Sequence, residues 1–96
     1  MRYFHRTSIP LDAVLEAADA FFGQRMQRTA SEPRHRVFSH TAGNVTVDAR
    51  IEGGHYTHVT VATDQVGESE VDKLAKRFLG TVHAKADPRH ELRGAY

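Results

Sequence analysis

The residue types of a hydrolytic triad occur on three neighbouring strands that the sequence predicts. The predicted strand pairing places Ser39, Asp48 and His58 in one row on the outer face of a sheet. A serine hydrolase needs its histidine between serine and carboxylate, because the imidazole takes the serine proton while the carboxylate orients the ring. Here the carboxylate lies in the middle. We therefore predict no catalytic residues, and we interpret Asp48 and His58 as a cross-strand ion pair on a solvated face.

The sequence contains seven histidines, which raises the question of a metal site. It has no HxH or HExxH spacing and no cysteine ligand. His55 and His58 point to opposite faces of their strand, and His40 lies two strands away from His55. We therefore predict no metal site and no cofactor.

His40 is predicted to point inward, where a histidine must find a hydrogen-bond partner. Two interpretations stay open for it. One is a satisfied core or rim histidine, and the other is the polar anchor of a pocket between sheet and helices. In the second interpretation a small ligand-binding cleft would be lined by Phe38, His40, Thr57 and Phe78.

The charge balance narrows the classes of function. Thirteen Lys and Arg against 12 Asp and Glu give a net charge of +1, whereas binders of nucleic acid or membranes usually carry a basic excess. Phe38 and Tyr56 are the only aromatic residues interleaved with the central arginines, and Phe38 fits the core better than a stacking platform. The sequence also lacks a bilayer-spanning run and the hydrophobic segment of a signal peptide, which predicts a cytoplasmic protein without membrane contact.

Two amphipathic segments predict helices. The first begins at Pro10 and ends at Gly23 as a C-terminal cap, and the second begins between Gly67 and Glu70, with Ser69 and Asp72 in capping-box-like spacing. Their apolar residues recur at helical spacing. The stripes are Leu11, Val14, Leu15, Ala18, Phe21 and Phe22 in the first segment, and Val71, Leu74, Ala75, Phe78, Leu79 and Val82 in the second.

Five further segments predict strands, at residues 2–9, 24–30, 34–41, 44–52 and 55–64. A two-residue turn at Gly43-Asn44 would pair Phe38 with Ala49. At Gly53-Gly54 the pattern requires an odd offset, so a three-residue loop or a bulge is predicted, with Val47 opposite Val59. The predicted inner face carries Phe38, Val45, Val47, Ala49, Ile51, Val59 and Val61, with His40, His55 and Thr57 also pointing inward.

These elements predict a single α+β domain over residues 1–86 and a polar C-terminal tail over residues 87–96. Its two layers are an antiparallel sheet of about five strands and two helices packed on one face, in the order β-α-β-β-β-β-α. This element order, from residue 2 to about 86, resembles the START-like or SRPBCC helix-grip superfamily in abbreviated form. The resemblance implies a hydrophobic ligand held between the sheet and the C-terminal helix.

The absence of a catalytic constellation makes a small non-enzymatic interaction module our first hypothesis, as a homo-oligomer or as an accessory subunit of a larger assembly. Arg50 and Tyr56 would be its anchors, because arginine and tyrosine are enriched at interface hot spots. The interface would use residues 87–96 and the polar outer sheet face, with Ser39, Asp48, Arg50, Tyr56 and His58. The second hypothesis is a small-molecule binding domain of helix-grip type that holds a small apolar ligand in the predicted cleft.

Overall fold

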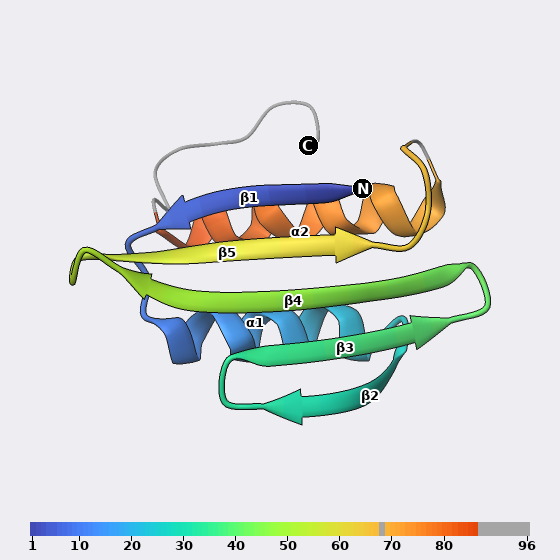
Figure 1. Cartoon of the computed structure of the whole chain (residues 1–96), viewed down its shortest axis with the longest axis horizontal. Helices are drawn as coiled ribbons and strands as arrows, with labels where there is room; N and C mark the ends of the chain where they lie inside the picture. The colour runs from blue at the N-terminus through green and yellow to red at the C-terminus, as the bar shows by residue number, and fades with distance from the viewer. Residues whose placement is uncertain (68, 87–96) are drawn as a thin grey trace.

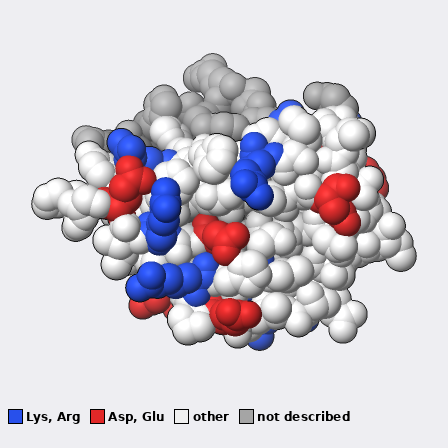
Figure 2. All heavy atoms as spheres, viewed as in Figure 1, with Lys and Arg blue, Asp and Glu red and all other residues white. Residues whose placement is uncertain are grey.

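The computed structural model describes residues 1–67 and 69–86 as a sheet covered by two helices (Figure 1). The elements are β1 (Arg2–Thr7), α1 (Leu11–Gly23), β2 (Gln27–Glu32), β3 (His35–His40), β4 (Gly43–Glu52), β5 (Tyr56–Thr63) and α2 (Glu70–Ala86). The five strands are antiparallel in the order β1-β5-β4-β3-β2. The predicted α+β architecture and element order are confirmed. Both helices lie behind the sheet, whose other face is turned to the viewer in Figures 1 and 2. The predicted tail, 87–96, lies outside the described residues.

The helix ends agree with the sequence only in part. Ser69 Oγ accepts a hydrogen bond from the Asp72 backbone N–H at 3.1 Å, so Ser69 caps α2 as predicted. Gly23, predicted as the C-terminal cap of α1, instead belongs to the helix. Gln24 follows it in a right-handed conformation with φ −80°, and Met26 N–H closes the chain onto the Phe22 carbonyl at 2.7 Å. This last turn uses the residues before Gln27, so β2 starts later than the predicted strand.

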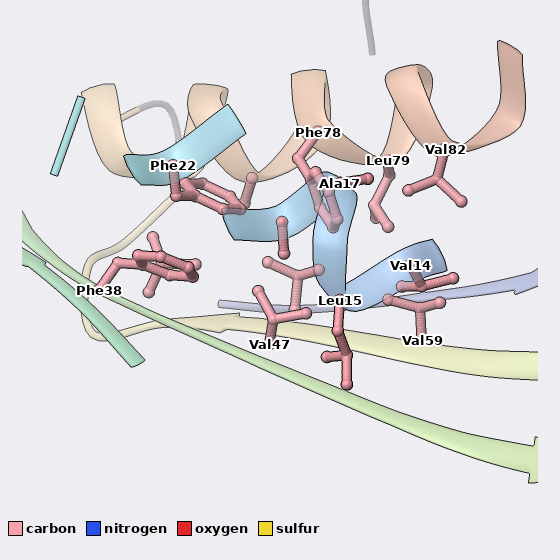
Figure 3. Close-up of a cluster of buried hydrophobic side chains, with 14 of the residues drawn as sticks. Val14, Leu15, Ala17, Phe22, Phe38, Val47, Val59, Phe78, Leu79 and Val82 are labelled. Carbon is pink, nitrogen blue, oxygen red and sulfur yellow. The ribbon is translucent and has the colours of Figure 1, made fainter. Parts of the chain in front are cut away.

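The core fills the space between the helices and the inner face of the sheet (Figure 3). Phe22 of α1 lies at its centre, with ring centroids 5.1 Å from both Phe38 of β3 and Phe78 of α2. All three rings are fully buried. Burial of such side chains stabilises the fold by roughly 1.5–3 kcal/mol each. The core therefore joins both helices to the middle of the sheet.

One of the seven apolar residues predicted for the inner face is not buried, and His55, also predicted to point inward, is exposed in the β4–β5 loop. Ile51 is 64% exposed, although the other six apolar side chains predicted for the inner face are buried. The β4–β5 hairpin runs beyond both helices at the left of Figure 1, so no helix covers Ile51 there. Alternation had identified the face correctly but carried no information about where the helices end.

The β3–β4 hairpin turns two residues earlier than predicted. His40 lies opposite Gly43, and Phe38 lies opposite Val45 rather than Ala49, so the predicted register was wrong. Because that displacement is an even number of residues, the same side chains still face inward. Thr41 and Ala42 make the turn.

Gly43 marks a close approach of two segments rather than the turn itself. Its φ is +142°, and a Cβ at this position would lie 2.7 Å from Gln65 Cγ and 2.9 Å from Asp64 Oδ1. The Asp64 carboxylate accepts hydrogen bonds from the Asn44 backbone N–H at 2.8 Å and from Asn44 Nδ2 at 2.9 Å. The backbone hydrogen bond from Asn44 lowers the pKa of Asp64, and a hydrogen bond from Gln65 lowers it further. These contacts clamp the β3–β4 turn to the end of β5.

The β4–β5 connection has the predicted three-residue length, with Glu52 opposite Tyr56 across Gly53, Gly54 and His55. Val47 lies opposite Val61, and Ala49 lies opposite Val59, so the exact pairing is displaced by two residues from the predicted one. The displacement is again even, and the inward face is preserved.

A polar contact ties the first strand to the last helix. The Asp72 carboxylate of α2 is fully buried and accepts a hydrogen bond from the Tyr3 hydroxyl of β1. Lys76 Nζ lies 3.5 Å from Asp72 Oδ2 and 5.5 Å from the centroid of the Tyr3 ring. Burial raises the pKa of Tyr3, and the hydrogen bond to Asp72 and its negative charge raise it further. Tyr3 therefore stays a hydrogen-bond donor at neutral pH.

Substitution of Gly43 is expected to destabilise the fold. Gly43→Ala should lower the free energy of unfolding by about 1–3 kcal/mol, because a side chain at this φ is strained and meets Gln65. Gly23→Ala is the matched control: Gly23 lies in a helix with open space around it, so alanine should add about 0.4–1 kcal/mol. Urea unfolding measures both. Equal effects of the two substitutions would contradict the close approach at Gly43.

Removal of one hydroxyl is expected to weaken the contact between β1 and α2. Tyr3→Phe should destabilise the protein by about 1–3 kcal/mol, because the buried Asp72 carboxylate loses a donor. Tyr56→Phe removes the same hydroxyl from an exposed side chain and should change stability by less than about 0.5 kcal/mol. Thermal or chemical denaturation compares the two variants. A Tyr3→Phe protein as stable as the Tyr56→Phe protein would show that the hydrogen bond contributes nothing.

Candidate functional site

The face of the sheet opposite the helices is uncovered in the described part of the chain, and it is the first candidate surface (Figure 2). Side chains of four adjacent strands meet there and line a trough of about 620 Å³. We call this the outer face. The trough is lined by Arg2, Phe4, Arg34, His35, Thr46, Asp48, Ala49, Arg50, His58, Thr60 and Ala62.

Aromatic side chains on the outer face remain open to solvent. Phe4 is 61% exposed and Tyr56 is 48% exposed. The Phe4 ring centroid lies 5.7 Å from that of His58, on the neighbouring strand β5. The Arg6 guanidinium lies 5.6 Å from the centroid of the Tyr56 ring. A partner that covers exposed aromatic surface of this kind is bound more tightly, because burial of the rings is favourable.

Charges of both signs are distributed over the outer face, where blue and red groups alternate in Figure 2. Arg6 pairs with Glu52 and His35 Nδ1 with Asp48 Oδ1, each at 2.5 Å. The remaining basic side chains of this face form no ion pair within residues 1–67 and 69–86. They are Arg2, Arg34 and Arg50. The face thus offers free cations beside carboxylates that already have a partner.

The predicted interface residues all lie on the outer face, but not in the predicted rows. Asp48 lies opposite His35 and Thr60, so the predicted ion pair with His58 is wrong. His58 instead lies between Arg6 and Arg50. Ser39 lies opposite Asn44, away from both, which removes the triad arrangement altogether. The even register displacements moved these partners without changing their face.

Sequence reasoning missed Phe4 and His35 as members of this surface. Phe4 stands between Tyr3 and His5 in a run where both alternating sets contain an aromatic residue, so periodicity alone did not separate them. Pairing with β5 decides it, because Phe4 lies opposite the outward Thr60 while Tyr3 lies opposite the buried Val61.

The side chains predicted to line a cleft do not come together around one cavity. Phe38 and Phe78 are fully buried against Phe22. Thr57 is buried near the start of α1, where its hydroxyl donates to the Ile9 carbonyl at 2.8 Å. His40 lies on the helix side of the sheet, as predicted, but it is not buried there. His40 is exposed, and its Nδ1 accepts the Ala42 backbone N–H at 3.0 Å, because β3 ends there and the chain turns.

A hollow of about 430 Å³ lies elsewhere, between the end of α1, the β3–β4 turn and the first half of α2. We call it the α1–α2 hollow. His40 is the one predicted cleft residue at its wall. The hollow is lined by Arg25, Met26, His40, Ala42, Glu70, Val71, Lys73, Leu74 and Arg77.

The described residues contain neither a metal-binding cluster nor a membrane-spanning helix. In residues 1–67 and 69–86, no three His, Asp or Glu side chains are grouped so that they could hold a metal ion. None of the helices within these ranges is long and apolar enough to cross a membrane.

Two histidines face each other between β1 and α2. The His5 and His83 ring centroids lie 5.9 Å apart in an edge-to-face arrangement. Burial lowers the pKa of His5, and the nearby His83 lowers it further. The folded protein therefore favours neutral His5. Stability from this site is present above the ordinary pKa of 6.5 and is lost as the pH falls through the lowered folded-state pKa.

A pH series is expected to reveal this effect. His5→Gln should lose less stability than the wild type between neutral pH and about pH 5, because the variant has no imidazole to protonate against α2. His55→Gln, in the exposed β4–β5 loop, serves as the control and should keep the wild-type pH dependence. Urea unfolding at each pH provides the measurement. Parallel curves for the wild type and His5→Gln would exclude His5 as a source of acid sensitivity.

Comparison with known proteins adds no relative to this description: no family model, no curated protein and no solved structure matches the chain. The proposals below therefore rest on the residues of the outer face and of the α1–α2 hollow.

Proposed function

We propose that this protein is a small interaction module that pairs with a second copy of itself through the outer face. The observation that carries the proposal is a sheet face, uncovered within the described part of the chain, on which the exposed rings of Phe4 and Tyr56 lie among charges of both signs. Interfaces are enriched in aromatic residues and arginine, which are the residue types concentrated here.

Charge complementarity favours a second copy as the partner. In a two-fold interface the same patch is contributed by both subunits, so it must be complementary to itself. A uniformly basic face would repel its own copy. Within the described residues, this face offers Arg2, Arg34 and Arg50 without an ion pair, together with Asp48 and Glu52, each of which is paired through one carboxylate oxygen. A cation of one copy can therefore meet a carboxylate of the other. Such pairs define the orientation of the two subunits more than they raise affinity.

Packing of two sheets supplies the apolar part of the contact. Sheets pack face to face about 10 Å apart with interdigitating side chains. Phe4 and its neighbour His58 offer a raised aromatic pair, and the small Ala62 and Thr46 leave room in the trough beside it. Tyr56 and Arg50 lie toward the hairpin end of the same face, where they would act as the second anchor.

Self-association is expected to depend on Phe4. Sedimentation at concentrations up to about 200 µM should show a species of twice the chain mass, and Phe4→Glu should weaken the pairing at least tenfold, because a carboxylate replaces buried aromatic surface. Val66→Glu introduces the same carboxylate at an apolar residue that is 79% exposed but off the sheet, and it should associate like the wild type.

The combined substitution of Arg50→Ala and Tyr56→Ala should also shift the equilibrium toward the monomer, without loss of the folded circular dichroism spectrum. A wild-type chain that stays monomeric over the whole range would overturn the proposal. Equal loss of pairing in Phe4→Glu and Val66→Glu would place the interface elsewhere.

A further inference from the structure

The α1–α2 hollow combines an apolar floor with a basic rim. Met26 is 7% exposed and Val71 is 1% exposed, and Leu74 and Ala42 extend this apolar surface toward the opening. The hollow, of about 430 Å³, falls within the range of small-molecule sites. It lies on the helix side of the domain, and none of its lining residues lines the trough of the outer face.

Among the described residues, three permanent cations surround the floor, against one carboxylate. Lys73 and Arg77 are four residues apart and lie on the same side of α2, and Arg25 faces them from the end of α1. Within residues 1–67 and 69–86, none of the three forms an ion pair. Among the described residues of the wall, Glu70 is the single acid. The rim therefore carries a surplus of positive charge that no described group neutralises.

Two of the rim groups are held in place by the chain itself. The Arg25 guanidinium donates to the Phe21 carbonyl at 2.6 Å and lies 4.2 Å from the centroid of the Phe21 ring, which leaves its other N–H groups free. His40 Nδ1 accepts the Ala42 N–H. In a neutral imidazole the proton must then be on Nε2, which makes His40 a donor at the wall. Both groups can donate to an anion with little loss of side-chain entropy.

The first turn of α2 also favours an anionic ligand. Glu70 and Val71, at the start of the helix, line the hollow. The positive end of the helix dipole therefore lies beside the rim cations. The dipole and the cations disfavour a positively charged ligand, and the apolar floor disfavours a small inorganic ion that stays fully hydrated.

We propose that the α1–α2 hollow binds a small organic carboxylate whose apolar body covers Met26, Val71 and Leu74. Its carboxylate meets Lys73 and Arg77 at the rim. This site goes beyond the proposed self-association, because it uses the opposite side of the domain.

Three probes separate the contribution of the apolar floor from that of the rim cations. Octanoate has an apolar chain and a carboxylate, octan-1-ol has the chain alone, and inorganic phosphate has negative charge alone. In ¹⁵N-resolved titrations, octanoate should shift the amides of Met26, Ala42 and Leu74 in a saturable manner. Octan-1-ol should bind about tenfold more weakly, and phosphate should leave these amides unchanged. Equal affinity of octanoate and octan-1-ol would overturn the role of the cations, and equal affinity of phosphate would overturn the role of the floor.

Matched variants test the residues. Lys73→Gln and Arg77→Gln should each weaken octanoate binding about threefold, the size expected of partly solvated charge pairs. Lys85→Gln makes the same change as Lys73→Gln near the far end of α2, at an exposed site outside the hollow, and should bind octanoate like the wild type. Equal losses in all three variants would show non-specific charge attraction and overturn the site.

A further variant tests the space without altering charge. Ala42→Leu places a larger side chain in the wall. It should weaken octanoate binding at least fivefold, because the side chain takes up space in the hollow. Its unfolding curve establishes that the variant folds. Unchanged octanoate affinity in folded Ala42→Leu would overturn the assignment to this hollow. Sedimentation of the same variant measures self-association through the outer face. Failure of the carboxylate site can therefore be distinguished from failure of the proposed self-association.

Discussion

The burial of Asp72 is the constraint on which the arrangement of the helix layer depends. A fully buried carboxylate is tolerated only where hydrogen bonds and a nearby cation compensate for its lost hydration. Tyr3 and Lys76 supply these partners, and Tyr3 comes from a strand that is 69 residues away in the chain. The start of α2 can therefore occupy one position against β1. Because Lys73 and Leu74 follow Asp72 directly, that position also sets where the wall of the α1–α2 hollow lies.

A second clamp positions the other wall of the hollow. Asp64 binds Asn44 through both carboxylate oxygens, and Gly43 allows the two segments to approach without a side chain between them. The β3–β4 turn is thereby held at the end of β5, and His40 and Ala42 are carried with it. Two polar contacts, Tyr3 with Asp72 and Asn44 with Asp64, thus position the two walls of the hollow. The aromatic residues Phe22, Phe38 and Phe78 belong to the buried core and do not line the hollow.

The periodic features of the chain were predictable, and the meeting of particular residues was not. Helical spacing identified both helices, and alternation identified the inner face, since each is a local property of the backbone geometry. The strand registers were wrong because an even displacement keeps every apolar side chain on the same face, so alternation cannot detect it. The sequence predicts Gly43 as a turn residue, whereas it begins β4 at a place where a Cβ would meet Gln65. His40 and Ile51 were assigned to the interior because the pattern does not show where the covering layer stops.

The candidate sites, too, were in part determined by the sequence and in part decided by tertiary structure. The sequence by itself determined that the domain has two helices on one face of a five-stranded antiparallel sheet, and that Arg50, Tyr56, Asp48, His58 and Ser39 lie on the other. Local hydrogen bonding and the alternation of side chains suffice for that. Tertiary structure alone decided that Asp48 pairs with His35, that Phe4 is exposed, and that Arg25, Lys73 and Arg77 surround one hollow. These relations join residues far apart in the chain, and they follow from burial and long-range hydrogen bonds, which have no period in the sequence.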